Sequence, residues 1–253
     1  MATFESAGLA IAYDQIGAAN PGQPLILIHG FSSNRNENWR RVGWYGALER
    51  RRMRFAALDC RGHGESAKPH DPAAYIRELM VDDVFALMDH LQIQIANLMG
   101  YSMGAHLAMA AALTQPDRIG DLILGGIGGA MFGPQRPTIP LIEAMEAESL
   151  DQISDPMARS FRQFADDQGE DRLALAACAK ARAEPIAASV SEIKVPTLVV
   201  AGARDELAGD PEELAARIPG ARAVTLPGCD HFSAIPHALF KAAVFDFLDG
   251  TLD

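Results

Sequence analysis

The residues best suited to nucleophilic chemistry form a short motif near the middle of the chain. Gly100-Tyr101-Ser102-Met103-Gly104 matches the pattern G-x-S-x-G, in which a sharp turn exposes a serine hydroxyl. The turn needs glycine on both sides because a Cβ there would clash. An apolar run precedes the motif and a run of small residues follows it. The sequence therefore predicts a strand, a turn and then a helix around Ser102.

A serine hydroxyl is a weak nucleophile and needs a general base within reach. The chain has seven histidines, and His231 lies in a loop between the last predicted strand and the closing helix. His90 and His106 fall within predicted helices, whereas His70 and His237 lie in polar or proline-flanked stretches that are typical of surfaces. His231 is therefore the predicted base.

The base in turn needs an acid that orients it and stabilises its charged form. Asp205 follows the apolar run Thr197–Ala201, and it lies between the serine and the histidine in the order expected for this turn motif. Glu206 and Asp210 are close by and stay open as alternatives. The segment Gly125–Thr138 contains no carboxylate, so an acid after the preceding strand is excluded.

Acyl transfer also needs two N–H donors for the oxyanion that develops on the substrate. One predicted donor is the backbone N–H of Met103, the residue after the serine. The other is the N–H of Phe31, which follows His29-Gly30 at the end of an early apolar run. His29 is interpreted as a brace of that turn.

These groups must be positioned by strands and helices that alternate along the chain. The predicted strands are Leu9–Ile16, Leu25–Ile28, Phe55–Leu58, Ala96–Tyr101, Asp121–Leu124, Thr197–Ala201 and Ala223–Leu226. The predicted helices are Asn38–Arg50, Tyr75–Leu91, Met103–Thr114, Pro211–Ile218 and Pro236–Leu248. Such alternation predicts an α/β fold with a mostly parallel central sheet and helices on both faces.

Residues 130–194 break the alternation, because amphipathic helices follow one another there without a convincing strand. We expect a short, inserted helical cap over the carboxyl edge of the sheet, where open α/β sheets hold their sites. The chain would then be a single domain of residues 1–253. Met157, Phe161 and Phe164 share one helical face in this segment. That face is either the roof of a pocket above Ser102 or the internal core of the cap.

Together, these motifs resemble those of the α/β-hydrolase fold family over nearly the whole chain. The loop Asp59–Ser66 matches the family's D-x-x-G-x-G-x-S loop, which is structural there, and the resemblance gives His63 the same role. Haloalkane dehalogenase-like and epoxide hydrolase-like members have an aspartate where this chain has Ser102. The resemblance is thus to the serine esterase and enol-lactonase-like branch. Ring-fission C–C hydrolases commonly have glycine where this chain has Ala105, which lowers that alternative.

The resemblance implies a serine hydrolase that acts on small or medium carboxylic esters through an acyl-enzyme. The alternatives are a C–C bond hydrolase of ring-fission products, a cofactor-free perhydrolase, and a non-catalytic ligand-binding protein on the same fold. An apolar substrate pocket is expected near Phe31, Tyr101, Met103, Met131, Phe132, Phe161, Phe164 and Phe232. The polar run Ser32–Trp39 could contact a polar substrate, but it is interpreted as a solvated loop.

The amino-acid composition limits which partners the protein can bind and in which cellular compartment it is expected. A net charge of −11 argues against nucleic acid, whose affinity depends on Lys and Arg. Three widely spaced cysteines fit neither a disulfide framework nor a metal pair, and no cofactor motif is complete, so neither metal nor cofactor is expected. The chain shows no leader and no apolar stretch long enough for a membrane span. We therefore expect a cytoplasmic protein with a small-molecule substrate, no membrane partner and an oligomeric state left open.

Overall fold

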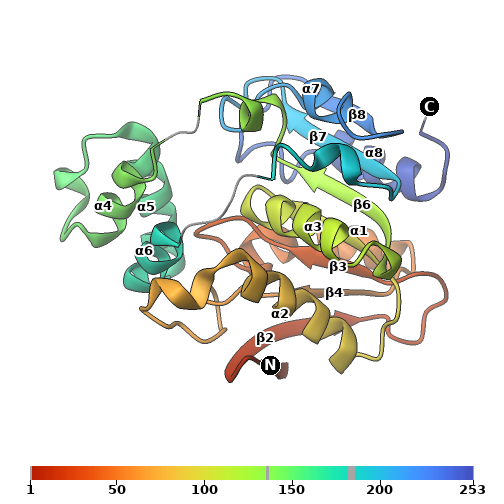
Figure 1. Cartoon of the computed structure of the whole chain (residues 1–253), viewed down its shortest axis with the longest axis horizontal. Helices are drawn as coiled ribbons and strands as arrows, with labels where there is room; N and C mark the ends of the chain where they lie inside the picture. The colour runs from red at the N-terminus through yellow and green to blue at the C-terminus, as the bar shows by residue number, and fades with distance from the viewer. Residues whose placement is uncertain (1, 135–136, 182–185, 253) are drawn as a thin grey trace.

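The computed structural model describes residues 2–134, 137–181 and 186–252, and these form one eight-stranded sheet flanked by helices (Figure 1). The strands are β1 Ala2–Ser6, β2 Leu9–Ile16, β3 Leu25–Ile28, β4 Phe55–Leu58, β5 Ala96–Tyr101, β6 Ile119–Gly125, β7 Thr197–Gly202 and β8 Arg222–Leu226. Their order across the sheet is β1-β2-β4-β3-β5-β6-β7-β8. The pairs β1–β2 and β2–β4 are antiparallel, and every other pair is parallel. The predicted mostly parallel sheet is confirmed.

The helices cover both faces of this sheet (Figure 1). They are α1 Trp44–Arg50, α2 Arg77–His90, α3 Met103–Thr114, α4 Ile139–Glu146, α5 Pro156–Gln168, α6 Arg172–Lys180, α7 Pro211–Ala215 and α8 Ala238–Leu248. Side chains of α2, α3 and α7 pack on one face of the sheet, and those of α1 and α8 pack on the other. The central strands β3 to β7 are apolar on both faces because both faces are covered.

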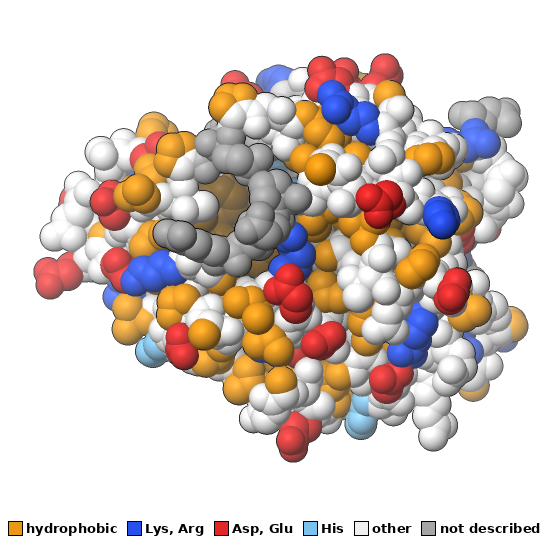
Figure 2. Space-filling model, in the orientation of Figure 1, with side chains coloured by type: hydrophobic (Ala, Val, Ile, Leu, Met, Phe, Trp, Pro, Cys, Tyr) orange, Lys and Arg blue, Asp and Glu red, His pale blue; other side chains and the backbone are white. Residues whose placement is uncertain are grey.

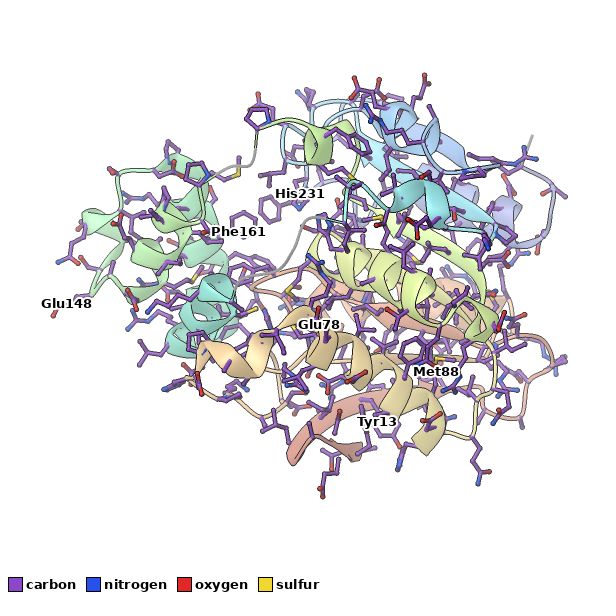
Figure 3. All side chains as sticks on the ribbon, in the orientation of Figure 1. Tyr13, Glu78, Met88, Glu148, Phe161 and His231 are labelled. Carbon is purple, nitrogen blue, oxygen red and sulfur yellow. The ribbon has the colours of Figure 1, made fainter. Side chains whose placement is uncertain are left out.

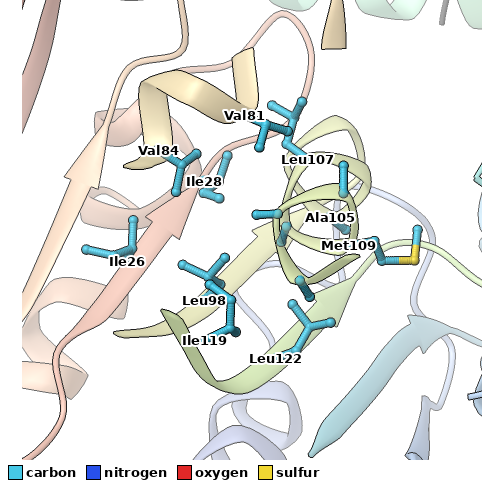
Figure 4. Close-up of a cluster of buried hydrophobic side chains, with 14 of the residues drawn as sticks. Ile26, Ile28, Val81, Val84, Leu98, Ala105, Leu107, Met109, Ile119 and Leu122 are labelled. Carbon is cyan, nitrogen blue, oxygen red and sulfur yellow. The ribbon is translucent and has the colours of Figure 1, made fainter. Parts of the chain in front are cut away.

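The core beside the turn motif is built from small residues on α3. Figure 4 labels Ala105 and Met109 on α3 and Leu98 and Leu122 on the neighbouring strands β5 and β6, all members of one buried cluster. All four side chains are buried. Gly104, in the first turn of α3, has no room for a Cβ beside the Ile28 backbone, so this turn packs close to the sheet directly at the end of β5.

Two differences from the predicted elements have clear physical causes. The sequence missed β1, an edge strand in which Phe4 and Ser6 alone are buried, so its apolar pattern is weak. The helix predicted over Asn38–Arg50 is split into a short helical turn, Asn36–Arg40, and α1. Gly43 lies between them with φ 84°, a left-handed conformation that a continuous helix does not contain.

Helices α4, α5 and α6 pack on one another at one end of the molecule, apart from the sheet (Figure 1). Arg162 of α5 is buried among them, and its guanidinium donates to the carbonyls of Ala144 and Ala147 at 2.8 Å. These bonds satisfy carbonyls that the end of α4 leaves without helical partners. The interpretation of residues 130–194 as an inserted cap within a single domain stays a prediction.

None of the helices in the described part of the chain combines the length and apolar character that crossing a membrane requires.

Candidate active site

Ser102 lies at the junction of β5 and α3 in a strained conformation. Its φ of 54° and ψ of −113° are unusual for a residue with a side chain. A Cβ on Gly100 would clash with the backbone of Gly104, and one on Gly104 would clash with the backbone of Ile28. Both glycines are thus required by close backbone contacts. The turn has the strand–turn–helix form in which a serine hydroxyl projects from the sheet edge.

His231 and Asp205 are joined by a hydrogen bond in the loops that follow β8 and β7. His231 Nδ1 lies 2.8 Å from Asp205 Oδ2, and both residues are buried. The other carboxylate oxygen of Asp205 accepts the backbone N–H groups of Leu207 at 3.1 Å and Ala208 at 3.0 Å. The carboxylate is therefore held on both sides, and it fixes the orientation of the imidazole.

The two carboxylates that the sequence left open lie elsewhere. Asp210 accepts the backbone N–H of Glu212 at 2.9 Å and caps α7 from an exposed position. Glu206 borders a separate cavity. Of the three acids, Asp205 is the one that the structure places against His231.

Tyr101 holds the loop that carries the histidine. Its buried hydroxyl donates to the His231 backbone carbonyl at 2.5 Å, and the two rings lie 5.4 Å apart between centroids. Burial raises the pKa of the Tyr101 phenol well above its ordinary value, so the hydroxyl stays protonated and can donate. Tyr101 therefore acts as a brace for His231 as well as a wall residue.

Ser102 and His231 line one small cavity of about 20 Å³, roughly the space of one water molecule. The Ser102 hydroxyl makes no hydrogen bond within the described part of the chain. Hydrogen bonds of this kind often form or tighten only when substrate is bound. Both residues line the same space.

One of the two predicted oxyanion donors, Phe31, lines this cavity, and the other, Met103, directly follows Ser102 in the chain. Within the described residues, the backbone N–H groups of Phe31 and Met103 have no protein acceptor. The N–H of Met103 is one of the orphan donors of the first turn of α3, where the helix dipole also favours negative charge. Phe31 follows Gly30, whose own N–H is bound by the Asn38 side chain at 3.0 Å.

His29 and His63 lie beneath this turn as neutral, buried rings. His29 accepts the backbone N–H of Cys60 through Nε2 at 2.9 Å and donates through Nδ1 to the Gly30 carbonyl at 2.8 Å. Burial lowers the pKa of His29 to about 4 and that of His63 to about 3. At neutral pH both rings are therefore uncharged, and the His29 tautomer is fixed by its two partners.

The aromatic residues expected at the pocket form a cluster above the cavity. Phe161 of α5 lies 6.0 Å from Phe31 and 5.7 Å from Phe232 between ring centroids, and Phe164 lies 6.0 Å from Phe232. Phe232 also packs edge-on against His231 at 5.6 Å. Figure 3 shows Phe161 and His231 between the helices α4 to α6 and the sheet, and the Phe232 ring contacts both of them. These four phenylalanines line the cavity of Ser102.

Met131 and Phe132, which the sequence placed at the same pocket, lie elsewhere. Met131 lines a second cavity of about 560 Å³ that is also bordered by His106 and Leu207. The Arg217 guanidinium lies 3.8 Å above the centre of the Phe132 ring. Both residues belong to the short turn Gly129–Phe132, which packs against α7 rather than over the serine.

One buried carboxylate joins the helices α4 to α6 to the loops of the sheet. Glu170, in the turn between α5 and α6, accepts the backbone N–H of Gly64 at 2.8 Å and the Asn34 amide at 2.9 Å. Burial raises the pKa of this carboxyl above its ordinary value. No motif in the sequence points to a role for Glu170. Its bonds connect the turn after α5, the helix that carries Phe161, to the loop predicted to be structural.

Within the described residues, no group of three or more His, Cys, Asp or Glu side chains is placed to hold a metal ion. A sequence model of the alpha/beta hydrolase family matches residues 25–242, which include the turn around Ser102, Asp205 and His231. The chain belongs to the alpha/beta hydrolase family. Hydrolases are prominent among the proteins that this chain resembles.

Two curated relatives and one solved structure illustrate the likeness. The chain is 31% identical over 243 residues to the "dihydrolipoyllysine-residue acetyltransferase component of acetoin cleaving system" of Pseudomonas putida, covering 90% of this chain and 63% of that protein. It is 29% identical over 222 residues to a "2-hydroxy-6-oxononadienedioate/2-hydroxy-6-oxononatrienedioate hydrolase" of Cupriavidus pinatubonensis, covering 77% and 76%. The enol-lactonase of Burkholderia xenovorans is 27% identical with a TM-score of 0.80, covering 98% and 100%. The chain spans 63% or less of the length of the first curated relatives it matches.

Proposed function

We propose that this alpha/beta hydrolase is a serine hydrolase that cleaves small or medium carboxylic esters through an acyl-enzyme. The observation that carries the proposal is the bond of 2.8 Å between His231 and Asp205, made by a histidine that shares its cavity with Ser102. A base oriented by a buried acid, next to a serine on a strained turn, is the arrangement that activates a hydroxyl for acyl transfer.

In this mechanism His231 Nε2 takes the proton from Ser102 Oγ, which attacks the ester carbonyl carbon. The oxyanion that forms accepts hydrogen bonds from the backbone N–H groups of Phe31 and Met103. His231 then gives its proton to the departing alcohol, leaving an acyl group on the serine. A water molecule, deprotonated by the same imidazole, releases the acid and restores the hydroxyl. Asp205 stabilises the imidazolium in both halves of the reaction.

The proposal includes a small-molecule substrate, a cytoplasmic location and no nucleic-acid partner. On the face in Figure 2, Lys and Arg side chains are scattered among Asp and Glu and form no continuous basic patch. The three cysteines are unpaired, which fits a reducing compartment.

Cleavage of a C–C bond in a ring-fission product is the second candidate function. Two curated relatives whose alignments cover most of both proteins carry names of that reaction, one at 29% and one at 27% identity. The same serine, histidine and oxyanion donors can serve that chemistry, so the residues of the triad do not separate the two candidates. The two candidate functions are distinguished by which class of substrate the protein turns over.

A panel of substrates tests the proposed function. We expect turnover of p-nitrophenyl acetate and p-nitrophenyl butyrate to exceed that of a lactone and of a 2-hydroxy-6-oxo-dienoate, measured as kcat/KM on the purified protein. The Ser102→Ala variant is the control for uncatalysed and surface hydrolysis. Cleavage of the dienoate without ester turnover would assign the C–C reaction instead. A protein that turns over nothing in the panel would support the non-catalytic binding alternative.

The aromatic cluster supplies a prediction about chain length. Phe161 and Phe164 line the cavity, whose volume of about 20 Å³ is too small for an acyl chain. To admit an acyl chain, these side chains must move, or be shortened by substitution. We expect Phe161→Ala and Phe164→Ala to shift the preference from acetyl toward octanoyl esters by about tenfold or more in kcat/KM, in line with ~1–3 kcal/mol per methylene in an apolar pocket. Because both rings are half-buried, the melting temperature should change little.

Leu173→Ala is the matched control for this pair, because Leu173 lies in the same group of helices and is 51% exposed. It should leave both selectivity and melting temperature unchanged. If instead both phenylalanine variants lose about 3–5 kcal/mol of stability and keep the parental selectivity, the shared face is internal core.

A further inference from the structure

Asn38 combines two properties that its place in the polar run Ser32–Trp39 did not reveal. Its side chain is 2% exposed and lines the same cavity as Ser102. Its Oδ1 accepts the backbone N–H of Gly30 at 3.0 Å, while its Nδ2 has no hydrogen-bond partner in the described part of the structure. A buried amide donor is thus left unpaired in the wall of the candidate active site.

The orientation of this amide is fixed by its partner. Since the Gly30 N–H can only donate, the oxygen of Asn38 must face it, and the NH₂ group must face the other way. A buried donor without an acceptor costs free energy, so native structures rarely keep one unless a ligand or water can pair with it. The cavity beside Asn38 is the place where such an acceptor can enter.

Two neighbouring groups lack this combination. Ser32 Oγ and Trp39 Nε1 are also buried and unpaired in the described structure. Neither residue lines the cavity of Ser102, whereas Asn38 does. Of these three buried and unpaired groups, the Asn38 amide is the one in the wall of the cavity.

The position of Asn38 shows which part of a substrate it would meet. A Cβ placed on Gly30 would lie 3.5 Å from Ser102 Cβ and 3.7 Å from Asn38 Oδ1, so the amide and the serine approach the same glycine. Gly30 immediately precedes the oxyanion donor Phe31. The leaving alcohol must depart on the side of His231, which protonates it. We assign the amide to the other side of the reacting carbonyl, where the acyl group lies.

We propose, on the basis of the proposed esterase function, that Asn38 Nδ2 donates to an oxygen on the carbon next to the scissile carbonyl. The site would thus select acyl groups with an alkoxy, hydroxy or keto oxygen at that carbon over plain alkyl chains. Asn38 is a specificity-determining residue in this account. A site with a buried donor discriminates against analogues that lack the matching acceptor, because the donor is then left unpaired.

Two esters of equal chain length test this assignment: p-nitrophenyl methoxyacetate and p-nitrophenyl butyrate, which differ by an oxygen in place of a methylene. The quantity measured is the ratio of their kcat/KM values, in which the intrinsic reactivity of each ester is the same for all variants. Asn38→Asp keeps an oxygen for the Gly30 N–H and replaces the donor with an acceptor. We expect it to lower the methoxyacetate preference by about tenfold, the scale of one hydrogen bond.

Asn36→Asp is the matched control, because Asn36 lies on the same helical turn, is exposed and gains the same charge. Its ratio should equal that of the wild type. Asn38→Ala removes the donor without adding charge and is measured in parallel, with a melting curve for each variant, should the aspartate variant not fold. Its ratio should fall in the same direction.

An unchanged ratio in the Asn38 variants overturns the assignment. An equal loss on both esters also overturns it, since Asn38 would then only support the turn or the oxyanion. A wild-type protein that hydrolyses neither ester contradicts the proposed function itself, and the inference falls with it. That outcome is distinct from normal ester turnover with an unchanged ratio.

Discussion

Ser102→Ala should lower kcat for ester hydrolysis by about 10⁶-fold, the loss seen when the nucleophile of a comparable triad is removed. Without the hydroxyl no acyl-enzyme forms, and only the oxyanion donors and binding remain to assist attack by water. The backbone of the turn should persist, because alanine can take the same φ of 54° at a similar cost. Initial rates on p-nitrophenyl butyrate, with circular dichroism of the variant, measure the effect.

Ser160→Ala is the control for this substitution, because Ser160 is an exposed serine on α5 that bonds only to the Pro156 carbonyl. It should retain full activity. His231→Ala should cost about as much as Ser102→Ala, and the double variant little more than either, because residues that act as a unit give non-additive losses. Substantial activity in Ser102→Ala, or losses that multiply in the double variant, would contradict the proposed triad.

Asp205→Asn should lower kcat by about 10⁴-fold, as the corresponding change does in a serine-protease triad. The reason can be read from the contacts of the carboxylate. Two backbone N–H groups, of Leu207 and Ala208, require an oxygen on one side, so the amide NH₂ of an asparagine must face His231. The imidazole then has to accept at Nδ1 and carry its proton on Nε2, where it cannot take the serine proton.

Asp210→Asn is the matched control, since Asp210 is a nearby carboxylate that caps α7 and asparagine is also a good capping residue. It should keep nearly full activity. The assignment of the acid is wrong if Asp210→Asn is severely impaired while Asp205→Asn is mild. A pH–rate profile of both variants adds a readout that a purely structural defect would not change.

The parts of the site that depend on local backbone chemistry could be predicted from the sequence. The turn around Ser102 is recognisable in the sequence because only glycine fits at Gly100 and Gly104. The apolar run before the turn predicts the strand, and the run of small residues after it predicts the helix. Asp205 and His231 could be proposed because parallel strands bring their carboxyl ends to one edge of the sheet. The mostly parallel sheet followed from the same alternation.

The parts that depend on tertiary packing could not be predicted. The turn at Met131 and Phe132 was expected near the serine, but it packs against α7 because a chain leaving β6 can turn either way. Glu170 contacts Gly64 across 106 residues of sequence, and no local pattern predicts such a bond. Asn38 reaches back to Gly30 because a short helical turn at Asn36–Arg40 replaces the start of the predicted helix.

Labelling with a fluorophosphonate, followed by peptide mapping by mass spectrometry, tests whether Ser102 is the nucleophile. The reagent forms a stable covalent adduct with an activated serine and with few unactivated ones. We expect one adduct, on the peptide that carries Ser102. It should be absent in Ser102→Ala and sharply reduced in His231→Ala. An adduct on a different residue, or none in protein that turns over esters, would contradict the assignment of Ser102.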